Sequence, residues 1–246
     1  MGRLFAVSDI HGYGRLLERL LDRANYRPRQ DRLYLLGDYV NKGPDSAGTL
    51  DIVARLCAAG AVALQGNNER KWLHQVPGAA VADEAAAARY RRFIAGLPLW
   101  AEYGPYLFVH AGLRPGVPLS AQTPEDLTEI REPFHGSPGL HGRIVVFGHT
   151  STFRFGLPPD ALWQNDGKLG IDTGAGHGHY LSLVELSEGW QWLVPVAGPA
   201  DEAGTAGGGG SACGAGTAAG TGPVAVRRIR LRLQDVIRPV QRSPGQ

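Results

Sequence analysis

Carboxylate, amide and imidazole side chains recur at the ends of apolar runs along this chain. The residues in these positions are Asp9, His11, Asp38, Asn67, His110 and His149. The i, i+2 spacing of Asp9 and His11 lets both reach one ion, and the two oxygens of Asp38 can bridge two ions. Mixed oxygen and nitrogen ligands suit Mn, Fe or Zn better than Ca or Mg. The pattern therefore predicts a metal centre.

Each of these residues alone has an ordinary structural interpretation. An aspartate or asparagine after a strand is most often a helix N-cap or a turn residue. A single histidine is usually a polar residue with a hydrogen-bonding partner. The prediction rests on the whole set, because independent accidents would not place every member at the end of an apolar run.

Short apolar runs alternate with helix-like stretches in the first part of the chain. Strands are expected at residues 3–8, 32–36, 61–65, 106–110 and 143–147. Helices are expected at residues 14–24, 46–58 and 83–95. This βαβ order is typical of an α/β domain. Because strands of an open α/β sheet present their carboxyl ends to one crevice, we expect the five turns to face one another.

The pattern changes towards the C-terminus. The runs LGIDTG, YLSLVELS and WQWLVPV follow one another without helices and predict a second, mostly antiparallel layer packed on the first. We expect one domain over residues 1–197 and a flexible Gly/Ala-rich insertion over 198–222. Residues 223–246 would supply a C-terminal strand, with alternating apolar and basic residues, and a tail that returns to the domain.

Composition excludes several classes of protein. The formal net charge of the 246 residues is +2, so charge alone does not call for a nucleic-acid or membrane partner. Cys57 and Cys213 are too few for a disulfide framework, and neither a signal peptide nor a membrane span is recognisable. We expect a cytoplasmic protein.

The chain resembles the calcineurin-like metallophosphoesterases, most closely the bacterial Ser/Thr protein phosphatase type of the phosphoprotein-phosphatase branch. The resemblance covers about residues 3–196 and rests on the motifs SDIHG, GDYVNKGPDS, LQGNNE, FVHAGLRPG, VVFGHTST and IDTGAG. It implies an α/β (in some schemes α+β) fold, a four-layer metallophosphatase β-sandwich flanked by helices, with a dinuclear metal site at strand ends. It also implies two divalent cations, with Mn as the first choice and Fe or Zn as alternatives.

Residue roles follow from the resemblance. Asp9 and His11 would bind the first metal and Asp38 would bridge. The second metal would be bound by Asn67, His110 and His149. Lys42 and Arg131 would hold the phosphoryl group, as catalytic and substrate-binding residues. Arg131, in DLTEIREPF, could instead be one charge on a solvated helix face.

The sequence departs from the family where proton transfer takes place. The usual Asp-Arg-Gly and Gly-Asn-His-Glu are here Asn41-Lys42-Gly43 and Gly66-Asn67-Asn68-Glu69. In the family, the histidine is credited with protonating the leaving group and the aspartate with supporting it. Asn68 has no proton to give at neutral pH, and general acid catalysis typically supplies about 100- to 10,000-fold. His177 or His179 could be a substitute acid, although a solvent-facing loop position explains either of them more simply.

Three functions remain open from the sequence. The first is a metal-dependent phosphatase for phosphate monoesters, of the phosphoprotein (Ser/Thr) type. The second is a phosphohydrolase for nucleoside polyphosphates or other activated leaving groups, similar to the symmetrical diadenosine tetraphosphatases. The third is a metal-binding pseudo-phosphatase with a regulatory role. We rank them in that order, with a phosphorylated protein or a small phosphorylated compound as the partner.

Overall fold

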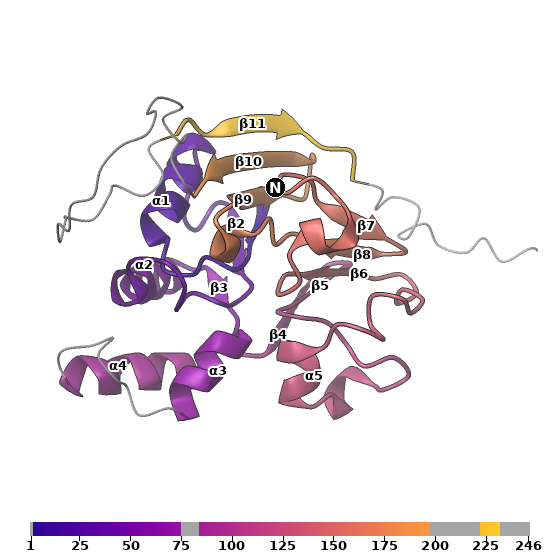
Figure 1. The fold of residues 1–246 in the computed structure, drawn as a ribbon, viewed down its shortest axis with the longest axis horizontal. Coiled ribbons are helices and arrows are strands. Elements are labelled where there is room, and N and C mark those ends of the chain that lie inside the picture. The colour runs from indigo at the N-terminus through magenta and orange to yellow at the C-terminus, as the bar shows by residue number, and fades with distance from the viewer. Residues whose placement is uncertain (1, 75–83, 197–221, 232–246) are drawn as a thin grey trace, which may run out of the picture.

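The computed structural model describes residues 2–74, 84–196 and 222–231. Most of the expected Gly/Ala-rich insertion and the end of the tail lie outside these ranges. The described chain forms two packed β-sheets with helices around them (Figure 1). The expected fold class, α/β with two sheets flanked by helices, is confirmed.

The first sheet has six strands in the order β11-β10-β9-β1-β2-β3. They are β1 (Leu4–Val7), β2 (Arg32–Leu35), β3 (Val62–Ala63), β9 (Tyr180–Glu185), β10 (Trp190–Pro195) and β11 (Ala225–Arg228). β1, β2 and β3 are parallel, whereas β9, β10 and β11 continue the sheet in antiparallel fashion from β1. At the outer edge, the side chain of Arg227 in β11 pairs with Asp160 at 2.7 Å.

The second sheet has five strands in the order β4-β5-β6-β8-β7. They are β4 (Trp100–Tyr103), β5 (Tyr106–Val109), β6 (Ile144–Phe147), β7 (Trp163–Asn165) and β8 (Lys168–Gly170). The expected grouping of strands was therefore wrong. β5 and β6 belong to the second sheet, whereas β9 pairs with β1 and is followed by β10 in the first sheet.

Alternating side chains divide the core into layers. Phe5 and Val7 of β1 face the helices on one side of the first sheet. Leu4 and Ala6 face the other way and pack between the sheets against Phe108 of β5. The far face of the second sheet is covered by a further cluster that includes Leu107, Leu127 and Phe134. The result is a four-layer arrangement.

The helices lie around these sheets (Figure 1). They are α1 (Gly14–Arg23), α2 (Ser46–Ala58), α3 (Asn67–His74), α4 (Glu84–Ala95) and α5 (Pro124–Glu129), with short 3-10 turns η1 (Leu119–Ala121), η2 (Thr152–Phe155) and η3 (Ala175–His177). α3 was not expected, so Asn67 opens a helix and does not lie in a simple turn. Among the described residues no helix has the length and apolarity needed to cross a membrane.

Candidate metal centre

The candidate ligands come from the carboxyl ends of strands in both sheets. Asp9 and His11 follow β1, Asp38 follows β2, and Asn67 opens α3 beyond β3. His110 and His149 follow β5 and β6 of the second sheet. The structure thus brings together every ligand expected from the sequence, although from two sheets and not from one crevice of a single sheet.

Left-handed backbone conformations mark this centre. The φ angles of Asp9, His11, Asp38 and His149 are 54°, 47°, 57° and 62°. Residues with a Cβ seldom adopt such angles, and their clustering is typical of functional sites. Close packing adds to the constraint, since a Cβ on Gly148 would lie 2.2 Å from Asp9 Oδ2.

The ligand atoms lie close together. His11 Nε2 is 3.8 Å from Asp9 Oδ1 and 3.6 Å from Asp38 Oδ2. On the other side, His110 Nε2 is 3.5 Å from Asp38 Oδ1. Asp9, Asp38 and His110 each offer an atom to one cluster whose members lie within 4.8 Å of one another. The two oxygens of Asp38 therefore face different imidazoles, as a bridging carboxylate would require.

Backbone carbonyls fix the tautomers of two histidines. His110 Nδ1 lies 2.7 Å from the Leu36 carbonyl oxygen, and His11 Nδ1 lies 3.1 Å from that of Val40. A carbonyl can only accept, so each Nδ1 donates and each Nε2 presents a lone pair to the centre. Such an orienting contact to the second ring nitrogen is usual for metal-binding histidines.

The electrostatics of the centre favour a cation. Burial raises the pKa of Asp9, with a further contribution from the charge of Asp38. Burial and the nearby charge of Asp9 raise the pKa of Asp172 to about 7. By contrast, burial and the neighbouring His110 lower the pKa of His149 to about 3, which keeps its imidazole neutral. Burial would lower the pKa of His110, but the charges of Asp38, Asp9 and Glu69 outweigh it and raise that pKa. A bound cation would compensate the same crowded carboxylates, and its ligands would have to be deprotonated.

Asn67 lies between the imidazoles of His110 and His149. Its amide oxygen lies 3.1 Å from His110 Nε2 and 3.0 Å from His149 Nδ1. With the amide turned over, its nitrogen can donate to Asp38 Oδ2 at 3.2 Å and to His110 Nε2 at 3.1 Å, so either amide orientation keeps Asn67 beside the other candidate ligands. His149 Nε2 is buried without a hydrogen-bonding partner. The donor set fits divalent metal ions.

Two buried carboxylates were missed as site residues, although both lie in quoted motifs. Glu69 accepts hydrogen bonds from the backbone N–H groups of Asp38 and Tyr39, both at 2.7 Å, and of Gly66 at 2.9 Å. Asp172 accepts from Ser151 Oγ at 2.7 Å. The three-residue step from Gly66 to Glu69 resembles a helix-capping pattern, which could have indicated the hydrogen bond between the Gly66 N–H and the Glu69 carboxylate.

Asn41 and Asn68 form a hydrogen-bonded chain with Asp38. Asn41 Nδ2 donates to Asn68 Oδ1 at 2.9 Å. Asn68 Nδ2 donates to Asp38 Oδ2 at 2.5 Å, and the Asn68 backbone N–H donates to Asp38 Oδ1 at 2.9 Å. The amide of Asn68 is thus committed to Asp38, and this pair of side chains contains no group that can release a proton near neutral pH.

The two predicted phosphate-binding cations lie on opposite sides of the centre. Lys42 Nζ is 3.1 Å from His11 Nε2. Arg131 is exposed and lies beyond the end of α5, so it is a solvent-exposed charge but not one on a helix face. Its charge contributes to the low pKa of His149, after burial and His110, so it lies near the His149 side.

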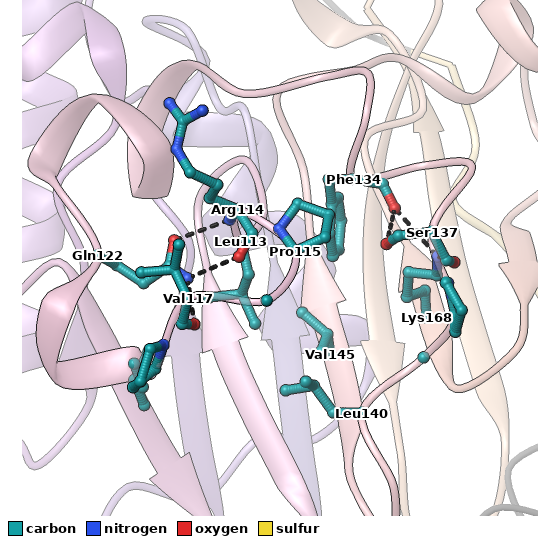
Figure 2. Close-up of a pocket in the computed structure, with 15 residues that line it drawn as sticks. Leu113, Arg114, Pro115, Val117, Gln122, Phe134, Ser137, Leu140, Val145 and Lys168 are labelled. Carbon is teal, nitrogen blue, oxygen red and sulfur yellow. Dashed lines mark hydrogen bonds between the residues drawn. The ribbon is translucent and has the colours of Figure 1, made fainter.

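A separate cavity of about 370 Å³ lies on the outer side of the second sheet (Figure 2). Leu113, Val117, Phe134 and Leu140 make its lining mainly apolar, and Lys168 lies at one side. None of the candidate metal ligands lines this cavity. It is therefore distinct from the metal centre.

Comparisons with known proteins agree with this geometry. The model of the calcineurin-like phosphoesterase family matches residues 2–180. A symmetrical bis(5'-nucleosyl)-tetraphosphatase of Dechloromonas aromatica (strain RCB) is 34% identical over 122 residues, covering 45% of this chain and 44% of the relative. One from Aromatoleum aromaticum (strain DSM 19018 / LMG 30748 / EbN1) is 38% identical over 129 residues, covering 46% and 45%. The alignments thus span less than half the length of these curated relatives.

Solved structures give a similar result. The crystal structure of a putative diadenosine tetraphosphatase superposes with a TM-score of 0.62 at 26% identity, covering 79% of this chain and 93% of that one. A Saccharomyces cerevisiae protein serine/threonine phosphatase superposes with a TM-score of 0.55 at 14% identity, covering 76% and 73%. The second likeness concerns the fold alone.

Proposed function

The chain belongs to the calcineurin-like phosphoesterase family, and from this premise we propose that it hydrolyses phosphoanhydrides of nucleoside polyphosphates. Symmetrical dinucleoside tetraphosphates are the first substrates to test. This reverses the order expected from the sequence, where a phosphoprotein substrate ranked first. The named relatives and the nearer structural neighbour are tetraphosphatases, which supports the new order.

The observation that carries the proposal is the series of side-chain hydrogen bonds from Asn41 through Asn68 to Asp38. An alkoxide leaving group such as that of phosphoserine needs a proton in the transition state, and Asn68 has none to give. A nucleotide phosphate leaves as a stable anion and needs little protonation. The site therefore suits anhydrides better than alkyl phosphate esters.

The residues of the centre have consistent roles under this proposal. Asp9, His11, Asp38, Asn67, His110 and His149 would hold two divalent metal ions. Metal ions bound there would activate a water molecule and stabilise in-line attack at phosphorus. Lys42 and Arg131 would hold the negative oxygens of the polyphosphate on either side of the reacting phosphorus, where charge accumulates. Asn68 would keep Asp38 in its bridging orientation.

Product analysis tests the proposal. Diadenosine tetraphosphate is incubated with the Mn²⁺-loaded protein and the nucleotides are separated by anion-exchange chromatography. ADP as the sole early product would support symmetrical cleavage, whereas AMP with ATP would indicate asymmetric attack. Hydrolysis of p-nitrophenyl phosphate serves as the control for an active preparation. Intact tetraphosphate in a preparation that cleaves the aryl ester would overturn the proposal.

A further inference from the structure

The segment between β8 and β9 lies directly on the candidate metal ligands. A Cβ on Gly176 would come within 2.3 Å of His11 Cδ2 and 2.8 Å of Lys42 Cδ. The backbone at Gly176 therefore packs against both side chains and leaves no room for a side chain of its own. The next residue, His177, is exposed to solvent. The segment thus places an exposed imidazole at the rim of the metal centre.

Aromatic rings meet at this rim. The ring centroids of His177 and Phe153 are 5.5 Å apart and their planes are 87° apart. The ring of His179 lies 5.0 Å from that of Phe153 at an angle of 66°. Phe153 and His179 are both partly exposed. Two nearly perpendicular rings form a corner that offers one face and one edge to a planar group.

Two cationic side chains, Lys42 and Arg154, lie near these rings. The Arg154 guanidinium carbon lies 5.7 Å from the centre of the Phe153 ring. Burial, followed by the charges of Lys42 and Arg154, lowers the pKa of His177, which places both cations near its ring. Neither Lys42 nor Arg154 forms an ion pair with a carboxylate within the described part of the chain. We name Phe153, Arg154, His177 and His179 the aromatic ledge.

We propose that the aromatic ledge binds the nucleobase of a nucleoside polyphosphate whose phosphates reach the metal centre past Lys42. Nucleobases stack on aromatic rings and on guanidinium planes, and phosphates pair with cations beside them. The ledge provides both kinds of group next to His11. This inference rests on the proposed function and extends it, because it names the part of the substrate that is recognised besides the phosphates.

Binding measurements test the ledge without turnover. ADP and ribose 5-diphosphate carry the same esterified diphosphate and the same sugar, so the ratio of their affinities isolates the contribution of the nucleobase. We expect isothermal titration in Mn²⁺ to show that the wild-type protein prefers ADP by about tenfold or more. His177→Ala and Phe153→Leu should each reduce that ratio to a few-fold, whereas His177→Phe, which keeps an aromatic ring, should retain most of it.

His141→Ala is the matched control, because it removes another exposed histidine and should leave the ratio unchanged. No preference for ADP in the wild-type protein, or a preference that survives both ledge substitutions, would overturn the inference. If the protein cleaves diadenosine tetraphosphate but the ledge variants keep the wild-type preference for ADP, only the proposed role of the aromatic ledge is refuted. If the ratio falls as expected but the tetraphosphate stays intact, the ledge stands and the proposed function is refuted.

Discussion

At the scale of single residues, the proposed function makes the two asparagines the groups that decide which leaving groups the site can accept. Asn41 Nδ2 and Asn68 Oδ1 are already 2.9 Å apart, which is the geometry that a histidine and its supporting carboxylate need. Replacing both by the acid pair of the family requires little movement of the backbone. The structure therefore makes a gain-of-function experiment possible.

We expect Asn68→His alone to raise the rate on a phosphoserine peptide modestly, because the new imidazole lacks a carboxylate. Adding Asn41→Asp should raise it by about tenfold or more, and the coupled gain should exceed the sum of the single changes expressed as free energies. Steady-state kinetics on the peptide and on p-nitrophenyl phosphate provide the comparison. Asn165→His, at the exposed last residue of β7, is the control. An unchanged peptide rate in the double variant would mean that another group already donates the proton.

Asp38 is the residue on which both metal sites are expected to depend. Asp38→Asn keeps the shape of the side chain but removes its charge, so bound Mn should fall and turnover should drop by roughly 100-fold or more. Metal content by mass spectrometry and turnover of p-nitrophenyl phosphate measure the two effects. Asp22→Asn changes an exposed aspartate and should alter neither. A variant with full metal content and full activity would contradict the bridging role.

At the scale of elements, a buried lysine fixes the segment that carries Arg131. Lys168 is 1% exposed and donates to the carbonyl oxygens of Phe134 at 3.0 Å and His135 at 3.1 Å, and also to that of Ser137. The side chain thus connects β8 to the segment that follows Arg131. Burial lowers its pKa.

Lys168→Met should destabilise the protein by about 3 kcal/mol, because buried carbonyl groups lose their donor. The free energy of unfolding from urea titrations measures this effect. Lys71→Met, at an exposed position of α3, should change it by less than about 0.5 kcal/mol. Equal stabilities of the two variants would show that water replaces the ammonium group without cost.

Asp31, directly before β2, contacts Arg3, directly before β1, and gives stability a dependence on pH. Its carboxylate accepts from Arg3 Nη2 at 2.7 Å and from the Arg27 backbone N–H at 2.9 Å. Burial alone would raise the pKa of Asp31, but these hydrogen bonds outweigh it and lower the pKa below the ordinary 3.8. The stabilisation is therefore present above about pH 4 and is lost as the pH falls through the lowered pKa.

Asp31→Asn should cost about 2 kcal/mol at pH 7 and progressively less below pH 4. Urea unfolding of both proteins across this pH range measures the difference. Asp51→Asn breaks an exposed pair with Arg89 and should cost less than about 0.5 kcal/mol at any pH. A difference for Asp31→Asn that stays constant down to pH 2 would contradict the linkage.

At the scale of the whole molecule, local patterns in the sequence were enough to find the candidate ligands that the fold brings together, but not the grouping of the strands into sheets. Apolar runs that end in a candidate ligand such as Asp38 or His110 are visible locally. The pairing of Ala6 with Val184 is not, because it joins segments that are far apart in the chain and no local pattern encodes it. For the same reason Glu69 and Asp172 were not assigned, since each acts on residues brought near by folding.

The central claim is that this centre favours stable leaving groups because it lacks a general acid. The most direct test is kcat/KM of the Mn²⁺-loaded protein for a series of phosphate compounds that spans nucleoside polyphosphates, aryl phosphates and alkyl phosphates. We expect a steep fall with rising leaving-group pKa, with anhydrides and p-nitrophenyl phosphate at least about 100-fold above phosphoserine peptides. A flat dependence, with phosphoserine cleaved as fast as the anhydrides, would contradict the account.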